Sequence, residues 1–249
     1  MPTLHLLGAG AVVSDPERTT TMMALDNGRG VLLVDCGGDV VPRLEATGLD
    51  PTALAGVVIT HEHADHVAGF PLMMERLWLM GRRDPLPVYG IAPALRQVRR
   101  VHDAFDVSGW EAYPGWTAHE VDHEANALVL DAHGWRVLAS PGRHAVPVVG
   151  LRFEDRATGR VASYSCDTAP DPAIAELARD ADLLLHEATG AGPVHSSAEQ
   201  AARTARQASA RRLVLVHLPR AEELARELPA ARRIRPDLEI GEELGRYRF

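Results

Sequence analysis

The segment Gly56–His66 has the sequence GVVITHEHADH, in which a short apolar run is followed at once by three histidines and an aspartate. The run GVVIT is typical of a strand buried on both faces. Imidazole and carboxylate groups hold Zn²⁺ and similar ions, and side chains two residues apart on an extended chain project to the same side, so His61 and His63 can bind one ion. Where the chain turns into a helix, Asp65 and His66 can reach a second ion. The alternative, a group of surface histidines beside acidic residues, fits poorly with a position directly after a core strand.

Four more polar residues follow predicted strands elsewhere in the chain. Asp35 follows VLLV, His144 follows ASPGR, Asp167 follows ASYSC and His217 follows LVLV. Polar residues at strand ends in layered α/β proteins commonly face the ligand crevice. Taken singly, each is explained equally well as a turn or capping residue.

Predicted strands come in two groups, each followed by helices. The strands are Thr3–Leu7, Thr21–Asp26, Gly30–Asp35, Gly56–Thr60, Pro87–Gly90, Leu128–Ala132, Arg136–Ser140, Val146–Glu154, Arg160–Ser165, Asp182–His186, Arg212–Val216 and a tail from Glu239. The helices are Val40–Thr47, Val67–Met80, Pro93–Phe105, Pro172–Arg179, Ala198–Ala210 and Ala221–Arg233. Two sheets packed face to face and one mixed sheet both fit this α/β pattern. Because no linker divides the 249 residues, residues 1–249 are predicted to form one domain.

Composition narrows the class of protein. With 26 basic and 34 acidic residues the net charge is −8, which disfavours a protein that grips nucleic acid through a basic face. No apolar run approaches the roughly 20 residues of a membrane span, and the first residues do not resemble a secretory signal. Two cysteines, Cys36 and Cys166, suit a reducing cytoplasm and are predicted to be small buried hydrophobes.

Other polar residues have simpler explanations. Arg96, Arg99 and Arg100 are predicted to form the solvated face of a helix. The histidines without a matching context are predicted to lie on the surface or in loops: His5, His102, His119, His123 and His133.

The order of the polar residues resembles the metallo-β-lactamase superfamily. Its five motifs are matched in order by Asp35, the cluster His61–His66, His144, Asp167 and His217. Within the superfamily the chain is most similar to the ribonuclease Z branch, because His186–Thr189 reads His-Glu-Ala-Thr and His195–Ala198 resembles its His-Ser-Thr-Ala segment. The resemblance implies an αββα sandwich of two mixed β-sheets flanked by helices.

The resemblance also implies a ligand set for two divalent ions. One ion would be held by His61, His63 and His144, the other by Asp65, His66 and His217, and Asp167 would bridge them. Asp35 would orient the ligands through hydrogen bonds from behind them. Zinc is the predicted metal, with manganese or iron as alternatives.

The resemblance further implies catalytic residues, among them Asp65. His195 would contact the scissile phosphate and protonate the leaving oxygen, and Glu187 with His186 would orient or tune that histidine. For His186 a satisfied core residue is an equally good explanation.

The predicted function is that of a dinuclear metal-dependent hydrolase acting on a small phosphodiester, such as a cyclic nucleotide or a short oligonucleotide. Metal binding lowers the pKa of a shared water from 15.7 toward about 7, and the resulting hydroxide attacks phosphorus in line. Only residues 145–166 separate His144 from Asp167, which leaves room for a β-hairpin but not for the long arm with which ribonuclease Z grips tRNA. Nucleic acid is therefore not the favoured partner.

Several alternatives stay open. The same site can serve a tRNA 3′-processing endonuclease, a lactonase, a thioesterase or an arylsulfatase, and a non-catalytic metal-binding protein is a third class. A diiron redox protein is disfavoured, because such relatives typically replace a cluster histidine with a carboxylate. A homodimer is an open expectation, since the apolar stretch Phe70–Leu79 fits either an interface or the core.

Overall fold

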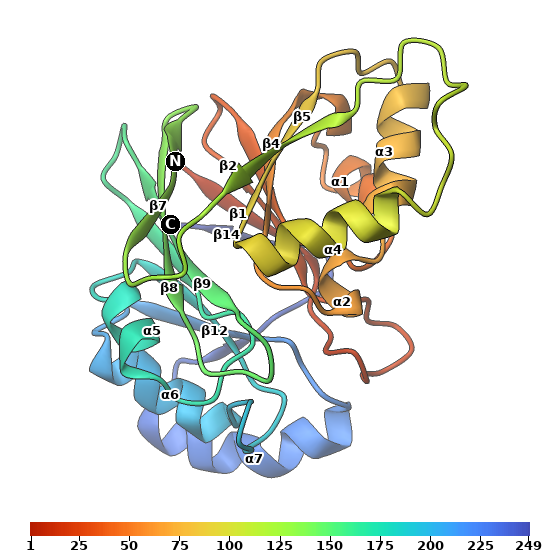
Figure 1. Cartoon of the computed structure of the whole chain (residues 1–249). Helices are drawn as coiled ribbons and strands as arrows, with labels where there is room; N and C mark the ends of the chain where they lie inside the picture. The colour runs from red at the N-terminus through yellow and green to blue at the C-terminus, as the bar shows by residue number, and fades with distance from the viewer.

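The computed structural model describes residues 1–249 as two seven-stranded β-sheets packed face to face between outer helices (Figure 1). Sheet 1 has the order β14 (Gly245–Arg248), β1 (Thr3–Gly8), β2 (Met22–Asp26), β3 (Val31–Val34), β4 (Leu54–Ile59), β5 (Leu86–Gly90), β6 (Trp116–Glu120). Sheet 2 has the order β13 (Glu239–Ile240), β12 (Arg212–Val216), β11 (Leu183–Glu187), β10 (Val161–Tyr164), β9 (Val149–Asp155), β8 (Trp135–Pro141), β7 (Ala127–Ala132). The predicted αββα sandwich of two mixed sheets is confirmed.

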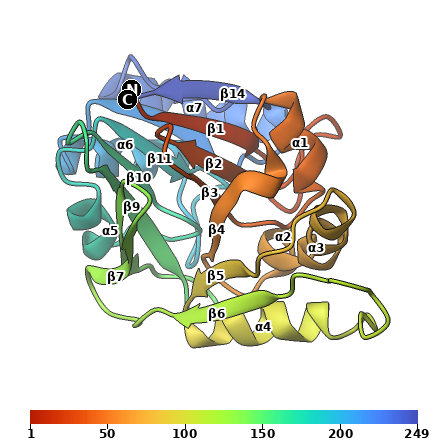
Figure 2. The same cartoon turned by 90° about the horizontal axis from the view of Figure 1, so that it is seen from above.

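The helices cover the two outer faces, as the view from above shows (Figure 2). The first half of the chain contributes α1 (Val40–Ala46), α2 (Ala64–Val67), α3 (Phe70–Leu79) and α4 (Ala92–His102), with a 3₁₀ turn at Pro51–Ala53. The second half contributes α5 (Pro172–Leu177), α6 (Ala198–Gln207) and α7 (Ala221–Ile234). None of these helices has the length and apolar character needed to span a bilayer.

The hydrophobic core is one cluster of 65 buried residues drawn from both sheets and from the helices that face them. Strands β3 to β6 run parallel in sheet 1, and β10 to β13 run parallel in sheet 2. The carboxyl ends of parallel strands meet at one edge of a sheet, so residues that follow these strands are brought together. The parallel strands therefore bring Asp35, the cluster from His61 and the residues Asp167 and His217 to the same edge of the sandwich.

The helix predicted over Val67–Met80 is wrong in its bounds. The structure divides the region into α2, which already contains Asp65 and His66, and α3, with a break at Gly69. A Cβ at Gly69 would lie 2.1 Å from the carbonyl oxygen of Gly38, so the chain passes too close to that loop for any other residue. Within α3, Phe70, Met73, Met74 and Leu77 are buried in the core, whereas Leu72 and Leu79 are exposed.

Two further expectations are corrected. Strand β6 at the edge of sheet 1 had no counterpart among the predicted strands. His5 is not a surface residue: it is only 5% exposed, and β14 from the far end of the chain pairs with β1 and places Arg246 directly opposite it. The sequence around His5 contains no pattern from which its pairing with β14 could be predicted.

Candidate metal centre

The predicted ligands lie at the carboxyl edges of the two sheets, where the sheets face each other. In sheet 1, Asp35 follows β3 and the cluster beginning at His61 follows β4. In sheet 2, Asp167 follows β10 and His217 follows β12, while His144 comes from the loop between β8 and β9. Residues up to 182 positions apart in sequence are thereby gathered at one edge, and all except His63, Asp65 and His144 are buried.

Three of the nine non-glycine residues with positive φ lie at strand ends beside the predicted ligands. Asp35 has φ 58°, Cys166 has φ 53° and His217 has φ 50°. Non-glycine residues rarely adopt this region, and such outliers gather where a side chain must be aimed at a functional site. The backbone therefore turns sharply at the ends of β3, β10 and β12, next to the proposed ligands.

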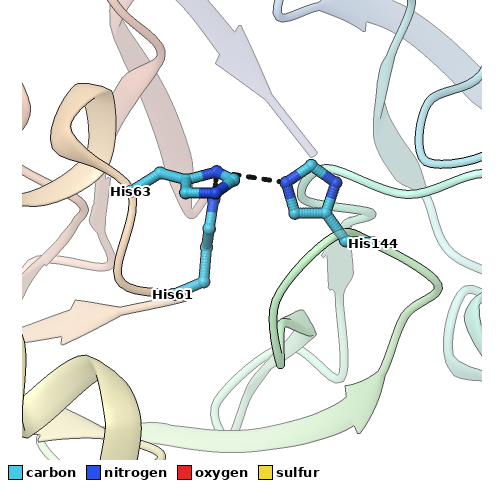
Figure 3. Close-up of side chains that lie close together, drawn as sticks. All are labelled: His61, His63 and His144. Atoms are coloured by element: carbon cyan, nitrogen blue, oxygen red, sulfur yellow. Dashed lines mark hydrogen bonds between the residues drawn. The ribbon is translucent and has the colours of Figure 1, made fainter.

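Three imidazoles meet across the gap between the sheets (Figure 3). The Nδ1 atom of His63 lies 3.1 Å from Nε2 of His61 and 3.1 Å from Nε2 of His144. Two nitrogen ligands of a tetrahedral zinc ion with bonds of 2.0–2.1 Å are separated by about 3.4 Å. The spacing of these nitrogens thus fits one divalent ion.

A second group of four residues lies beside the first: Asp65, His66, Asp167 and His217, whose ligand atoms all lie within 4.8 Å of one another. Nε2 of His66 and Oδ1 of Asp167 are buried without a hydrogen-bond partner, although they are only 3.6 Å apart. Buried polar atoms without partners are costly, and a cation between these two atoms would satisfy both.

Asp167 reaches both groups of ligands. Its Oδ2 lies 3.3 Å from Nε2 of His217 and 4.0 Å from Nε2 of His144, while Oδ1 faces His66. Burial alone would raise the pKa of Asp167, but His217 and His66 hold it well below the ordinary value. The carboxylate is therefore ionised, as a metal ligand must be.

The protonation of the histidines follows the surrounding charges. Burial, followed by the neighbouring His66, lowers the pKa of His61 well below its ordinary value, so His61 is neutral. Burial opposes protonation of His66 too, but the carboxylates of Asp35 and Asp167 outweigh it and raise the pKa of His66 well above the usual value. The site is thus rich in carboxylate charge and favours a bound cation.

Asp35 lies behind His66 rather than at the ligand cluster itself. Its Oδ2 is 2.7 Å from Nδ1 of His66, and its two oxygens accept hydrogen bonds from the backbone and hydroxyl groups of Thr60 at 2.8–3.1 Å. This contact fixes a proton on Nδ1 and turns Nε2 toward the predicted ligand cluster, where a metal ion would replace the second proton.

We expect Asp35→Asn to weaken metal binding by about 10- to 100-fold, because the amide supports His66 less well than the carboxylate does. A titration of the metal-stripped variant with Zn²⁺, compared with wild type, measures this loss. An unchanged affinity would contradict the orienting role of Asp35.

Two other predicted ligands, His144 and His217, are oriented by the loop between β11 and α6. Nδ1 of His144 lies 3.0 Å from the carbonyl oxygen of Val194. The hydroxyl of Thr189 donates to the carbonyl of His217 at 3.0 Å, so it accepts from Nδ1 of His217 at 2.6 Å. Both rings therefore carry the proton on Nδ1 and present Nε2 to the site. Sequence reasoning missed these contacts, and for the Val194 carbonyl no sequence signal exists.

The same loop brings His195 to the metal-ligand cluster. Its Nδ1 lies 2.9 Å from Oε1 of Glu187. The Glu187 side chain is fully buried, and its two oxygens also accept backbone hydrogen bonds, Oε1 from Thr168 and Oε2 from Thr189. The hydrogen bond to Glu187 raises the pKa of His195 above its ordinary value. The ring stacks at 5.8 Å between centroids against His217, so an imidazole whose protonated form Glu187 stabilises lies next to the predicted ligands.

His186 is not brought to His195. Successive residues of a strand face opposite sides of the sheet, so His186 of β11 points away from the face that carries Glu187. Its Nδ1 donates to the carbonyl of Glu187 at 2.8 Å, and burial lowers its pKa. The geometry favours a structural role for His186.

We expect His186→Leu to keep kcat within about tenfold of wild type while lowering stability by about 1–3 kcal/mol, since a buried carbonyl loses its donor. Thermal unfolding and steady-state kinetics measure the two effects. A loss of activity as large as that of a Glu187 variant would restore His186 to the catalytic group.

Both cysteines are buried, as predicted. Sγ of Cys166 lies 3.6 Å from Nδ1 of His61, on the side of the ring opposite to the ligand nitrogen Nε2. Burial raises the pKa of Cys166 well above its ordinary value, which favours the neutral thiol over the thiolate.

Comparison with known proteins places the fold and site in a family. Residues 31–218 match the model of the β-lactamase superfamily domain. Ribonuclease Z of Salinibacter ruber is 32% identical over 297 aligned residues, covering 97% of this chain and 92% of the relative. Ribonuclease Z of Methanothermobacter thermautotrophicus is 26% identical, covering 98% and 95%. The crystal structure of the short form of human tRNase Z superposes with a TM-score of 0.80 at 23% identity, covering 99% and 98%.

A metal-dependent hydrolase of the metallo-β-lactamase fold is the class of protein that the fold and the cluster define. The chain belongs to the β-lactamase superfamily, and its similarity to ribonuclease Z over nearly its whole length confirms the predicted branch.

Proposed function

We propose that the chain is a phosphodiesterase that works with two divalent ions, zinc in the first place, on a small phosphodiester. The observation that carries the proposal is the position of Asp167 between the two groups of predicted ligands. Its Oδ1 lies 3.6 Å from Nε2 of His66, and its Oδ2 lies 3.3 Å from Nε2 of His217 and 4.0 Å from Nε2 of His144. His61, His63 and His144 would hold one ion, and Asp65, His66 and His217 the other. The preponderance of imidazole favours zinc over magnesium or calcium.

Ions bound there would supply a water of lowered pKa and would stabilise charge on the phosphoryl oxygens. His195 would then supply the proton that the leaving oxygen needs. Glu187 keeps that proton on His195 by raising its pKa and holds the ring through Nδ1, so Nε2 points away from the carboxylate. A buried carboxylate paired with an imidazole beside a metal cluster is the arrangement expected for protonating an alkoxide leaving group.

A small substrate is supported by the connection between β9 and β10. The two strands pair antiparallel, Val161 with Glu154, and are joined by a turn over residues 156–160. The alignment with Salinibacter ruber ribonuclease Z extends over 297 residues although this chain has 249, so the relative contains residues without a counterpart here. The hairpin has no extension that could grip a folded RNA.

Hydrolysis of bis(p-nitrophenyl) phosphate with added Zn²⁺ or Mn²⁺ tests the proposal, with the His63→Ala variant as the matched control. We expect turnover at least about 100-fold above that control. Equal rates for the two proteins with both metals would refute a metal-dependent phosphodiesterase.

A panel of substrates tests the choice of ester. We expect cyclic nucleotides and short oligonucleotides to be hydrolysed faster than a lactone, a thioester or an aryl sulfate. If one of those three compounds were hydrolysed faster, the proposed metal centre would stand, but the proposed substrate would be that class of ester and not a phosphodiester.

The second candidate function is tRNA 3′ processing, which is favoured by the names of the relatives. A precursor tRNA with a 3′ trailer belongs in the same panel. Cleavage of this precursor in preference to short oligonucleotides would establish the second candidate.

A further inference from the structure

A second group of polar residues lies at the opposite end of the sandwich from the metal centre. Strand β12 begins at Arg212 and ends next to His217, and five residues of strand span about 17 Å. At the Arg212 end there is a hollow of about 580 Å³. Its lining contains no hydrophobic residue and consists of Thr3, His5, Asp26, Arg212, Arg246 and Arg248.

The register of β1 and β14 places two arginines side by side. His5 pairs with Arg246 and Thr3 pairs with Arg248 across the two strands. Side chains two residues apart on a strand project to the same face, about 7 Å apart, so Arg246 and Arg248 are neighbours. Like charges on one face are destabilising, and their cross-strand partners are not acidic, so they provide no compensation.

Little of this positive charge is neutralised within the protein. Arg212 is paired with Glu239 through two contacts of 3.0 and 3.1 Å. Arg246 donates at 2.6 Å to the carbonyl of Thr47, which is not a carboxylate. Asp26 brings one carboxylate to the lining, but it forms no ion pair with Arg246 or Arg248, and its Oδ1 accepts a hydrogen bond from the backbone of Gly28 at 2.8 Å. Arg246 and Arg248 are thus left without an acidic partner in a chain whose net charge is −8.

A buried histidine supplies an independent observation. His5 is 5% exposed, and its Nδ1 is buried without a hydrogen-bond partner. Burial, followed by the charge of Arg246, lowers the pKa of His5, so the ring is neutral and has one N–H to donate. His5 also lines the hollow, so its neutral ring adds a polar surface that carries no charge of its own.

We propose that this hollow binds the phosphate group of a small molecule. Arg246 and Arg248 provide forked donors that match phosphate oxygens, and Thr3 and His5 provide neutral donors on the facing strand. A second hollow of about 480 Å³ is also lined by Arg212 and Arg246, and it adds Ile240 and Tyr247 as apolar surface for the rest of the ligand. Its lining further contains Arg232 and two carboxylates, Glu239, which pairs with Arg212, and Glu242. Sites of this size accept a ligand as large as a nucleotide.

Titration calorimetry of the metal-loaded protein with inorganic phosphate, and separately with a nucleoside 5′-monophosphate, tests the proposal. The test variant is Arg246→Gln/Arg248→Gln, and the matched control is Arg100→Gln/Arg206→Gln, which changes two exposed arginines on α4 and α6. Phosphate also binds to metal centres, so two binding events are expected in the wild-type protein. The event that is lost in the test variant but kept in the control variant is assigned to the hollow. Melting temperatures without ligand check that both variants fold.

We expect the test variant to bind phosphate at this site at least about tenfold more weakly than wild type, while the control is unchanged. Tighter binding of the nucleotide than of phosphate would assign the second hollow to the nucleoside, and equal binding would assign the site to phosphate alone. The proposal is overturned if both double variants behave alike, or if wild type binds phosphate only at the metal centre. Neither result bears on phosphodiesterase activity, so the two proposals fail separately.

Discussion

Replacing Asp167 by asparagine is expected to cost more than 100-fold in activity and to remove at least one bound metal ion. Outer carboxylates that only orient ligands typically contribute 10- to 100-fold, whereas Asp167 itself lies within 4.0 Å of both groups of predicted ligands. The amide keeps the shape of the side chain but cannot supply the negative charge that the two proposed cations would share.

The measurement is metal content after dialysis, together with turnover of bis(p-nitrophenyl) phosphate. Asp122→Asn, at an exposed carboxylate after β6, is the matched control and should behave as wild type. If Asp167→Asn retained the full metal content and half of the activity, the bridging role would be wrong.

Replacing His195 by alanine is expected to lower kcat by about 10²–10⁴-fold with the metal content unchanged, because this residue is proposed to move a proton and not to hold an ion. That separation distinguishes it from Asp167. His119→Ala, at an exposed histidine of β6, is the matched control. Loss of metal together with activity would instead make His195 a ligand.

The pH dependence tests the partnership with Glu187. Because the hydrogen bond to Glu187 raises the pKa of His195, the protonated donor persists above the ordinary value of about 6.5, and kcat should fall as pH rises through the raised pKa. Glu187→Gln removes the charge, so the alkaline limb of the kcat profile should move to lower pH. A merely structural role for Glu187 would lower kcat without moving that limb.

The sequence predicted those strands and metal-ligand candidates that are marked by a continuous apolar run or by a cluster of histidines next to one. The run GVVIT is apolar at every position that β4 buries, and the histidines directly after it have no other ready explanation. The pairing of Glu187 with His195 rested on the motif resemblance, and the structure brings the two side chains within 2.9 Å. Their catalytic roles stay predictions until the variants are measured.

The ends of helices and the spatial neighbours of single side chains were less predictable from the sequence, because both depend on contacts with segments far away in the chain. The division of Val67–Met80 into two helices arises where Gly69 passes the loop at Gly38. His186 and Glu187 are adjacent in sequence, yet the strand sends them to opposite faces.

The sequence by itself determined the ligand types, their order along the chain and the two groups of strands, since these depend on side-chain chemistry and local hydrophobic pattern. Tertiary structure alone decided that sheet 1 and sheet 2 face each other with their carboxyl edges aligned, and that β14 covers His5. Pairing between segments far apart in the chain depends on how whole sheets pack, and no local run of residues encodes it. For the same reason, only the folded molecule shows that the predicted metal ligands come together from both halves of the chain. The position of Arg246 and Arg248 beside the buried His5 is likewise a property of the fold.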